Sequence, residues 1–125
     1  MEHPSLSGRS ILVVENEPLI AMDIVTALED AGAHATTTNT VRHALILVEH
    51  DGLSAAIMDH GLGDGDSTQL CARLKTRGIP YVSYSGYAPV EGTSENSLHL
   101  SKPVPMDVLM SAVDGLLTGK PPRIS

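Results

Sequence analysis

Apolar and polar positions follow two different periods along this chain. Five short runs of mostly apolar residues alternate with longer segments in which apolar residues recur every three or four positions. A short continuous apolar run is typical of a strand buried on both faces of a parallel sheet, and the longer period is typical of a surface helix. The runs predict strands at residues 10–14, 34–38, 54–59, 79–84 and 98–101, of which 34–38 is polar enough to lie at an edge.

Four helices are predicted in the intervening segments, at residues 18–31, 41–50, 67–77 and 106–117. Pro18 suits the first turn of a helix, and Asn39 or Thr40 suits the cap of the second one. Gly32 and Gly78 mark the ends of the first and third helices. The segment between residues 88 and 97 holds a Pro and a Gly and few apolar residues, so a helix in that crossover is predicted to be short or absent.

Strands that alternate with helices at this spacing predict right-handed crossovers and a parallel sheet. Five such strands suit an α/β fold with a doubly wound five-stranded parallel sheet of order 2-1-3-4-5. The 125 residues are enough for one domain, which we place at residues 9–118. Residues 1–8 are predicted to be a flexible N-terminus, and residues 119–125 a tail or the start of a linker.

Composition excludes several classes of function. A net charge of -7 argues against direct nucleic-acid binding, which needs a basic surface. No apolar run approaches the length of a membrane span, the start of the chain has no secretory pattern, and the single Cys71 cannot form an internal disulfide. Together these features favour the cytoplasm. The six histidines show no spacing of a metal-ligand pair, and Cys71 lies on the predicted inner stripe of its helix.

Polar groups stand at the ends of four predicted strands. Glu15 and Asn16 follow the first strand, Asp59 ends the third, and Ser85 and Lys102 follow the fourth and fifth. The carboxyl ends of parallel strands share one edge of the sheet, so these side chains are expected to converge. Acids that bind Mg²⁺, with a lysine and a hydroxyl that bind phosphoryl oxygens, suit phosphoryl transfer to a carboxylate.

This set of residues, in this order, resembles the receiver domain of two-component response regulators, which has a flavodoxin-like fold. The resemblance covers residues 9–118. It is carried by residues 13–18 (Val-Val-Glu-Asn-Glu-Pro), Met58-Asp59, Ser85-Gly86 and Lys102-Pro103. Each short motif is weak alone, but four of them at matching strand ends are specific.

The resemblance implies a signalling role in place of a conventional enzyme activity. A histidine kinase or histidine phosphotransfer protein would donate a phosphoryl group, and an unknown downstream protein would read the phosphorylated state. The domain would catalyse only its own phosphorylation and dephosphorylation. The resemblance implies that Asp59 is the phosphoacceptor. It implies that Ser85 is the phosphate-binding hydroxyl and Lys102 the cation. The implied Mg²⁺ ligands are Glu15, Asn16, Asp59 and the Gly61 carbonyl.

Two features depart from the family pattern. Asn16 stands where the family usually has an aspartate, so the site loses one negative charge and Mg²⁺ binding is predicted to be weakened. The interval from Ser85 to Lys102 is short, and His99 occupies the position of the usual switch aromatic. Tyr84 or Tyr87 is a candidate to replace that aromatic.

Three alternative functions remain at this stage. A pseudo-receiver, which binds partners without phosphorylation, is favoured by Asn16 and by the short crossover between the fourth and fifth strands. A small hydrolase with an aspartyl-phosphate intermediate needs a second acid two residues after the nucleophile, and that position is Gly61. A flavin-binding domain of the same fold needs a hydroxyl-rich phosphate loop after the first strand, which is absent here. The chain is expected to be either a stand-alone receiver or one domain of a longer protein.

Overall fold

The computed structural model describes residues 6–50, 52–59, 67–85, 97–101 and 105–118. Strands and helices alternate along residues 10–85, as predicted. The strands are β1 (Ser10–Val14), β2 (His34–Thr38), β3 (Ala55–Asp59), β4 (Tyr81–Ser85) and β5 (Ser97–Ser101). The helices are α1 (Pro18–Asp30), α2 (Val41–Leu47), α3 (Ser67–Thr76) and α4 (Met106–Thr118).

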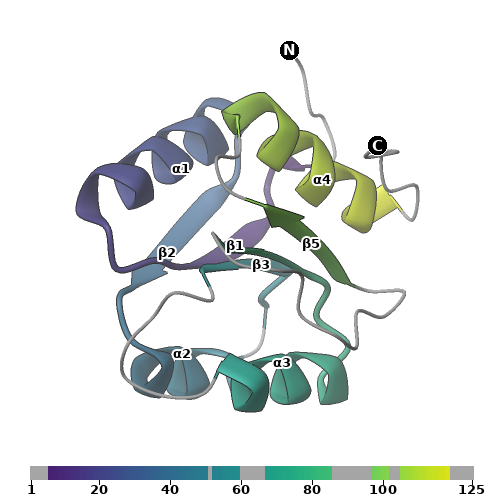
Figure 1. The fold of residues 1–125 in the computed structure, drawn as a ribbon. Coiled ribbons are helices and arrows are strands. Elements are labelled where there is room, and N and C mark those ends of the chain that lie inside the picture. Colours follow the sequence, from purple (N-terminus) through teal and green to yellow (C-terminus); the bar gives the residue numbers. More distant parts are fainter. Residues whose placement is uncertain (1–5, 51, 60–66, 86–96, 102–104, 119–125) are drawn as a thin grey trace.

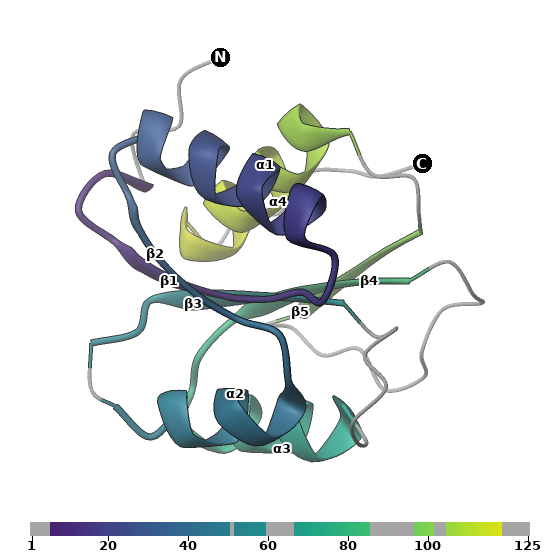
Figure 2. The same cartoon turned by 90° about the vertical axis from the view of Figure 1, so that its left-hand side faces the viewer.

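The strands form a parallel sheet in which β2, β1, β3 and β4 are neighbours in that order, and β5 pairs with β4. The predicted α/β class and the order of the first four strands are therefore confirmed. Helices α1 and α4 cover one face of the sheet and α2 and α3 the other (Figures 1 and 2). The predicted absence of a full helix between β4 and β5 concerns residues 86–96, which lie outside the described residues.

Each face of the sheet has its own apolar core. The α1/α4 core includes Val13, Ile57 and Val82 from the sheet, and the α2/α3 core includes Val14 and Met58. Successive residues of a strand point to opposite faces, so each central strand supplies both cores. This explains why the central strands read as continuous apolar runs instead of alternating ones.

Local signals in the sequence set most of the helix ends. Pro18 stands at the start of α1, and the Thr40 side chain caps α2 by accepting a hydrogen bond from the His43 backbone N–H at 3.1 Å. Gly32, after α1, has a φ of +88°, a conformation that residues with a Cβ rarely adopt. A Cβ at Gly32 would also lie 3.2 Å from the Ser7 hydroxyl oxygen.

The apolar residues Leu19 and Met22 of α1 are 74% and 62% exposed, and the helix packs through Ile24 and Leu28. Two bounds differ from the sequence analysis. Helix α2 ends at Leu47, three residues before the predicted end. Leu6 is fully buried in the α1/α4 core, so the packed part of the chain begins before residue 9.

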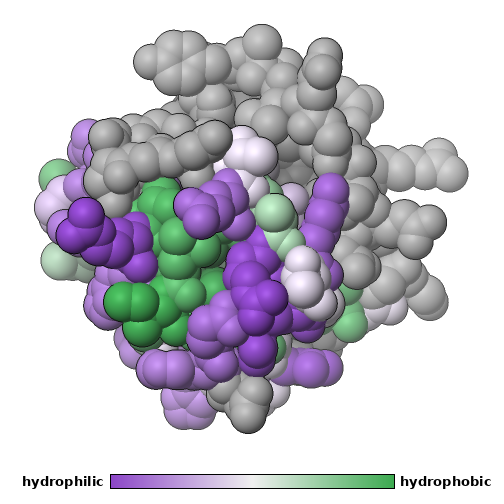
Figure 3. Space-filling model, turned by 90° about the horizontal axis from the view of Figure 1, so that it is seen from below, coloured by the Kyte–Doolittle hydropathy of each residue, from purple (hydrophilic) through white to green (hydrophobic). Residues whose placement is uncertain are grey.

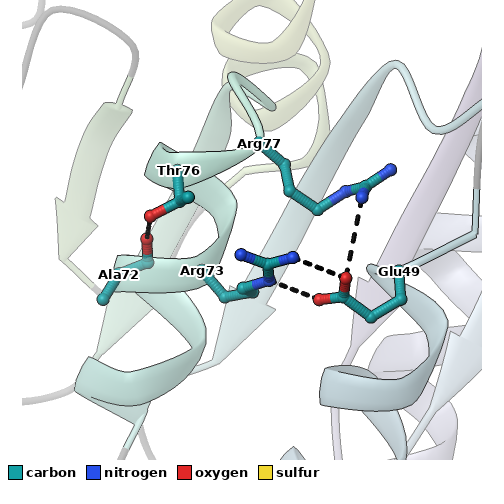
Figure 4. A network of polar contacts seen from close by, with 5 residues as sticks. All are labelled: Glu49, Ala72, Arg73, Thr76 and Arg77. Atoms are coloured by element: carbon teal, nitrogen blue, oxygen red, sulfur yellow. Dashed lines mark hydrogen bonds and ion pairs between the residues drawn. The ribbon is translucent and has the colours of Figure 1, made fainter.

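An ion-pair cluster joins the two helices below the sheet. Glu49, just after α2, accepts hydrogen bonds from the Arg73 guanidinium of α3, one of them at 2.6 Å, and lies 3.6 Å from Arg77 (Figure 4). The face that carries α2 and α3 also shows an apolar patch bordered by polar residues (Figure 3). Ile46 of α2 is 57% exposed. Within the described residues, no helix is long and apolar enough to cross a bilayer.

Candidate functional site

Three polar side chains form a row at the carboxyl edge of the sheet, on the face covered by α1 and α4. Asp59, the last residue of β3, is paired in register with Tyr84 of β4. Val14 is paired with Met58, which places Glu15 beside Asp59 when the register is continued by one residue. Each of the three lies two residues after a core residue of the same strand, and residues two apart on a strand share a face. The core residues are Val13, Ile57 and Val82, all in the α1/α4 core. The exposed fractions of Glu15, Asp59 and Tyr84 are only 3%, 1% and 4%.

Both carboxylate oxygens of Glu15 accept hydrogen bonds within the protein. The Tyr84 hydroxyl donates to Oε1, and the Glu17 backbone N–H donates to Oε2 at 2.9 Å. The Glu15 backbone is also fixed, because its N–H donates to the Thr38 carbonyl at 3.0 Å. Glu15 is therefore held at three points, from β2, from β4 and from the turn before α1.

The electrostatics of the row reflect two acids buried side by side. Burial raises the pKa of Glu15, and the nearby charge of Asp59 raises it further, while the hydrogen bonds from Tyr84 and from the Glu17 backbone oppose this rise. Burial raises the pKa of the Tyr84 phenol, and the hydrogen bond to Glu15 and then the negative charge of Glu15 raise it further. Tyr84 therefore keeps its proton at neutral pH and acts as the donor to Glu15.

Tyr84 is the site residue that the sequence analysis missed in this role. It was considered only as a replacement for a switch aromatic, not as a partner of Glu15. The signal was present in the strand pattern, since Tyr84 lies two residues after Val82 and therefore shares its face of the sheet. What was lacking was the register of β4 against β3, which sets Tyr84 opposite Asp59.

A cleft of about 350 Å³ adjoins the row on the side of β2. Its lining includes Glu15, the exposed Asn16, Asn39 at the end of β2 and His43 of α2. The His43 Nδ1 lies 3.0 Å from the hydroxyl of Thr38, which fixes the ring at the cleft wall. The cleft therefore brings solvent to the edge of the site at Glu15 and Asn16.

The donor set suits a hard cation that keeps part of its water shell. Glu15 and Asp59 supply carboxylate oxygens, and Asn16 lies at the cleft with an amide oxygen, which is the ligand chemistry of Mg²⁺. Among the described residues, no group of three His, Cys, Asp or Glu side chains is placed to hold a metal. The rest of the shell would have to come from amide, backbone or water oxygens.

The other predicted site residues are only partly visible. Ser85 is the last residue of β4 and therefore stands at the same edge of the sheet. Gly61 and Lys102 lie outside the described residues. The structure thus brings Glu15 and Asp59 together, places Asn16 at the adjoining cleft, and leaves the roles of Ser85, Gly61 and Lys102 as predictions.

Comparison with solved structures finds the same fold in proteins of two-component signalling. A response regulator receiver protein from Sinorhizobium medicae superposes with a TM-score of 0.81 over 90% of this chain and 97% of its own, at 24% identity. A sensor protein from Polaromonas is 26% identical, with a TM-score of 0.76, over 88% of this chain and 96% of its own. A signal receiver domain of a histidine kinase from Syntrophus aciditrophicus is 25% identical over 90% of this chain and 92% of its own, with a TM-score of 0.77. The chain thus has the fold of response regulator receiver domains and is similar to them in sequence.

Two further comparisons concern a longer regulatory protein and a receiver domain with a bound metal. The transcriptional regulatory protein TcrA of Mycobacterium tuberculosis is 28% identical over 120 residues, which cover 89% of this chain. The receiver domain spans about half the length of that relative, 47%. A receiver domain of a Pseudomonas aeruginosa sensor histidine kinase, 22% identical with a TM-score of 0.76 over 90% of this chain and 99% of its own, has a magnesium ion coordinated in its active-site cleft. No family model matches the sequence.

Proposed function

We propose that this receiver domain accepts a phosphoryl group on Asp59 from a phosphohistidine of a histidine kinase or histidine phosphotransfer protein. The observation that carries the proposal is the position of Asp59, a buried carboxylate at the carboxyl edge of the sheet beside a second acid, Glu15. The family supplies the chemistry, since receiver domains are the phosphoacceptors of two-component signalling.

In the proposed reaction, a carboxylate oxygen of Asp59 attacks the phosphorus atom of the donor. The P–N bond to the donor imidazole breaks, its electron pair returns to the imidazole nitrogen, and an acyl phosphate forms on Asp59. Ser85 and Lys102 bind phosphoryl oxygens in this proposal. A Mg²⁺ ion held by Glu15, Asn16, Asp59 and the Gly61 carbonyl supplies charge neutralisation for the phosphoryl group when it is bound.

The phosphoryl group changes the charge balance at a buried edge of the sheet. Asp59 gains negative charge beside Glu15, whose two oxygens already accept hydrogen bonds. Ser85 and Lys102 must compensate this charge, and they lie on either side of the crossover between β4 and β5. We propose that this crossover changes conformation on phosphorylation and is read by a downstream protein in the cytoplasm.

The test is the intact mass of the protein after incubation with a small-molecule phosphodonor, with Mg²⁺ or with a chelator. The expected result is the gain of one phosphoryl group that requires both Mg²⁺ and Asp59, so that Asp59→Asn gains nothing. Asp107→Asn, at an exposed position in the first turn of α4, is the control for the same change of charge. Phosphorylation that persists in Asp59→Asn would exclude Asp59 as the acceptor.

The pseudo-receiver is the second candidate, and Asn16 is the observation that favours it. If the protein gains no phosphoryl group from a small donor or from a phosphorylated histidine phosphotransfer protein, even at high Mg²⁺, the phosphoacceptor proposal fails. A phosphorylation-independent interaction module then becomes the better description.

A further inference from the structure

We propose that Tyr84 is a positioning residue of the metal site, which acts by holding the Glu15 carboxylate beside Asp59 through its hydroxyl group. The inference rests on the proposed function, because it assigns Glu15 to the Mg²⁺ shell. It adds a residue from β4 whose side chain contacts that acid and that the family motif does not include.

The hydrogen bonds of Glu15 are the first support. A glutamate has three rotatable side-chain bonds, and burial alone does not select one direction for its carboxylate. Here the Tyr84 hydroxyl fixes Oε1 and the Glu17 backbone N–H fixes Oε2. Tyr84 thus reaches this carboxylate from β4, while the Glu17 backbone reaches it from the turn before α1.

The placement of Tyr84 is the second support. Its backbone is paired in register with Asp59, and its ring is buried in the α1/α4 core, so the hydroxyl is delivered by a rigid element. Outer hydrogen-bond donors orient the carboxylates that bind metals, and their loss typically weakens metal binding by about 10- to 100-fold. Asn16 makes this support more important, because a site with one charge fewer depends more on the geometry of its remaining acids.

The hydroxyl also balances charge when no cation is bound. Glu15 and Asp59 are buried side by side at the ends of neighbouring strands, so two like charges would repel each other there. A phenol that donates to Glu15 partly offsets this repulsion without adding a permanent charge. A lysine or arginine at the same place would compete directly with a divalent cation, whereas a neutral donor leaves the charge of both acids available to the metal.

The test compares Tyr84→Phe with Tyr81→Phe. Both variants remove one phenol hydroxyl from β4, and both rings are buried, but Tyr81 packs in the α2/α3 core at the other end of the strand. Mg²⁺ affinity is measured by calorimetric titration, and the rise of Tm with added Mg²⁺ is measured separately. We expect Tyr84→Phe to bind Mg²⁺ about tenfold more weakly than the parent. We expect Tyr81→Phe to bind Mg²⁺ as the parent does.

A purely structural role would lower the Tm of Tyr84→Phe in chelator but leave its Mg²⁺ affinity unchanged, and this result would overturn the inference. Tighter binding by Tyr84→Phe would also overturn it, by showing that the hydroxyl competes with the metal. If the parent does not bind Mg²⁺, there is no metal site for Tyr84 to support, and the inference fails. Because affinity is measured without a phosphodonor, failure here is distinguishable from failure of Asp59 to accept a phosphoryl group.

A measurement on the parent protein covers the case in which Tyr84→Phe does not fold. The buried hydroxyl proton of Tyr84 is expected to exchange slowly with solvent and to give a resolved NMR signal. Its chemical shift should change when Mg²⁺ is added, while the ring signals of Tyr81 stay constant. A Tyr84 hydroxyl signal that is insensitive to saturating Mg²⁺ would contradict the inference.

Discussion

At the scale of single residues, Asn16 is the position where a small change has the largest expected effect on the site. Asn16→Asp restores a carboxylate at the cleft beside Glu15, and a full charge close to a divalent cation outweighs an amide dipole. We expect Mg²⁺ affinity to rise by roughly tenfold or more. Calorimetric titration measures this, with Asn39→Asp as control, because Asn39 is exposed and lines the same cleft.

The Asn39 control separates a ligand effect from a general charge effect. If both variants bind Mg²⁺ more tightly by the same factor, the added charge acts through the field of the cleft and Asn16 is not a ligand. An unchanged affinity in Asn16→Asp would contradict the idea that the amide weakens the site.

The residue scale also shows what the sequence could and could not predict about the site. The sequence predicts that Glu15 and Asp59 lie close together, because each is the first acid after an apolar run and parallel strands end at a common edge. The Tyr84 hydrogen bond to Glu15 was not predicted, because it joins residues 69 positions apart and depends on strand register. A shift of one residue in β4 would turn the phenol to the other face of the sheet.

At the scale of elements, the ion-pair cluster between α2 and α3 gives a pH-dependent contribution to stability. The hydrogen bond from Arg73 lowers the pKa of Glu49, and the charges of Arg73 and Arg77 lower it further. A lowered pKa in the folded state means that the cluster stabilises above the ordinary pKa of 4.5 and loses this effect as pH falls through the folded value. Because these groups lie at the surface, the effect is small and screened by salt.

Glu49→Gln is the variant that tests this cluster. We expect a slightly lower Tm than the parent at pH 7 and low salt, and the same Tm for both proteins well below pH 4.5 or at high salt. Thermal unfolding at several values of pH and salt concentration measures the difference in Tm between the two proteins. A Tm difference that persisted unchanged at low pH would assign the effect to helix packing or the turn after α2, not to charge.

The helices also show where periodicity misleads at this scale. In α1 the apolar Leu19 and Met22 share the helical period but face solvent, and Ile24 and Leu28 make the core contact. A helical period of apolar residues identifies a helix, but it does not show which side of the helix packs against the protein. That choice depends on the sheet face and on α4 beside the helix. The strands were predicted more closely, since the central ones are buried on both faces and need no such choice.

At the scale of the whole molecule, the site places two acids next to apolar cores that offer little relief of their charge. Asp59 and Glu15 are buried at the end of a sheet whose two faces are filled by apolar cores. The charge of Asp59 disfavours the ionised form of Glu15, so the stability of the two cores offsets an unfavourable electrostatic interaction at the edge. Such a site costs stability in the absence of a cation or phosphoryl partner.

Neutralising the acceptor should therefore stabilise the metal-free protein. We expect Asp59→Asn to raise the free energy of unfolding by about 0.5–2 kcal/mol in chelator, as relief of a strained functional site commonly does. Asp107→Asn makes the same change in net charge at the start of α4, where an acid is favourable, so it should be neutral or slightly destabilising. Denaturant unfolding in chelator measures both variants.

Added Mg²⁺ should make the parent more stable to unfolding than the Asp59→Asn variant, the reverse of their order in chelator. A ligand that binds only the folded state stabilises it in proportion to the logarithm of its concentration above Kd, so the parent gains stability and Asp59→Asn gains less. If Asp59→Asn is less stable than the parent in chelator, the ionised Asp59 makes net favourable interactions in the metal-free state. The two acids at the sheet edge would then be part of what holds the domain together, and the stability cost assigned to the site would be wrong.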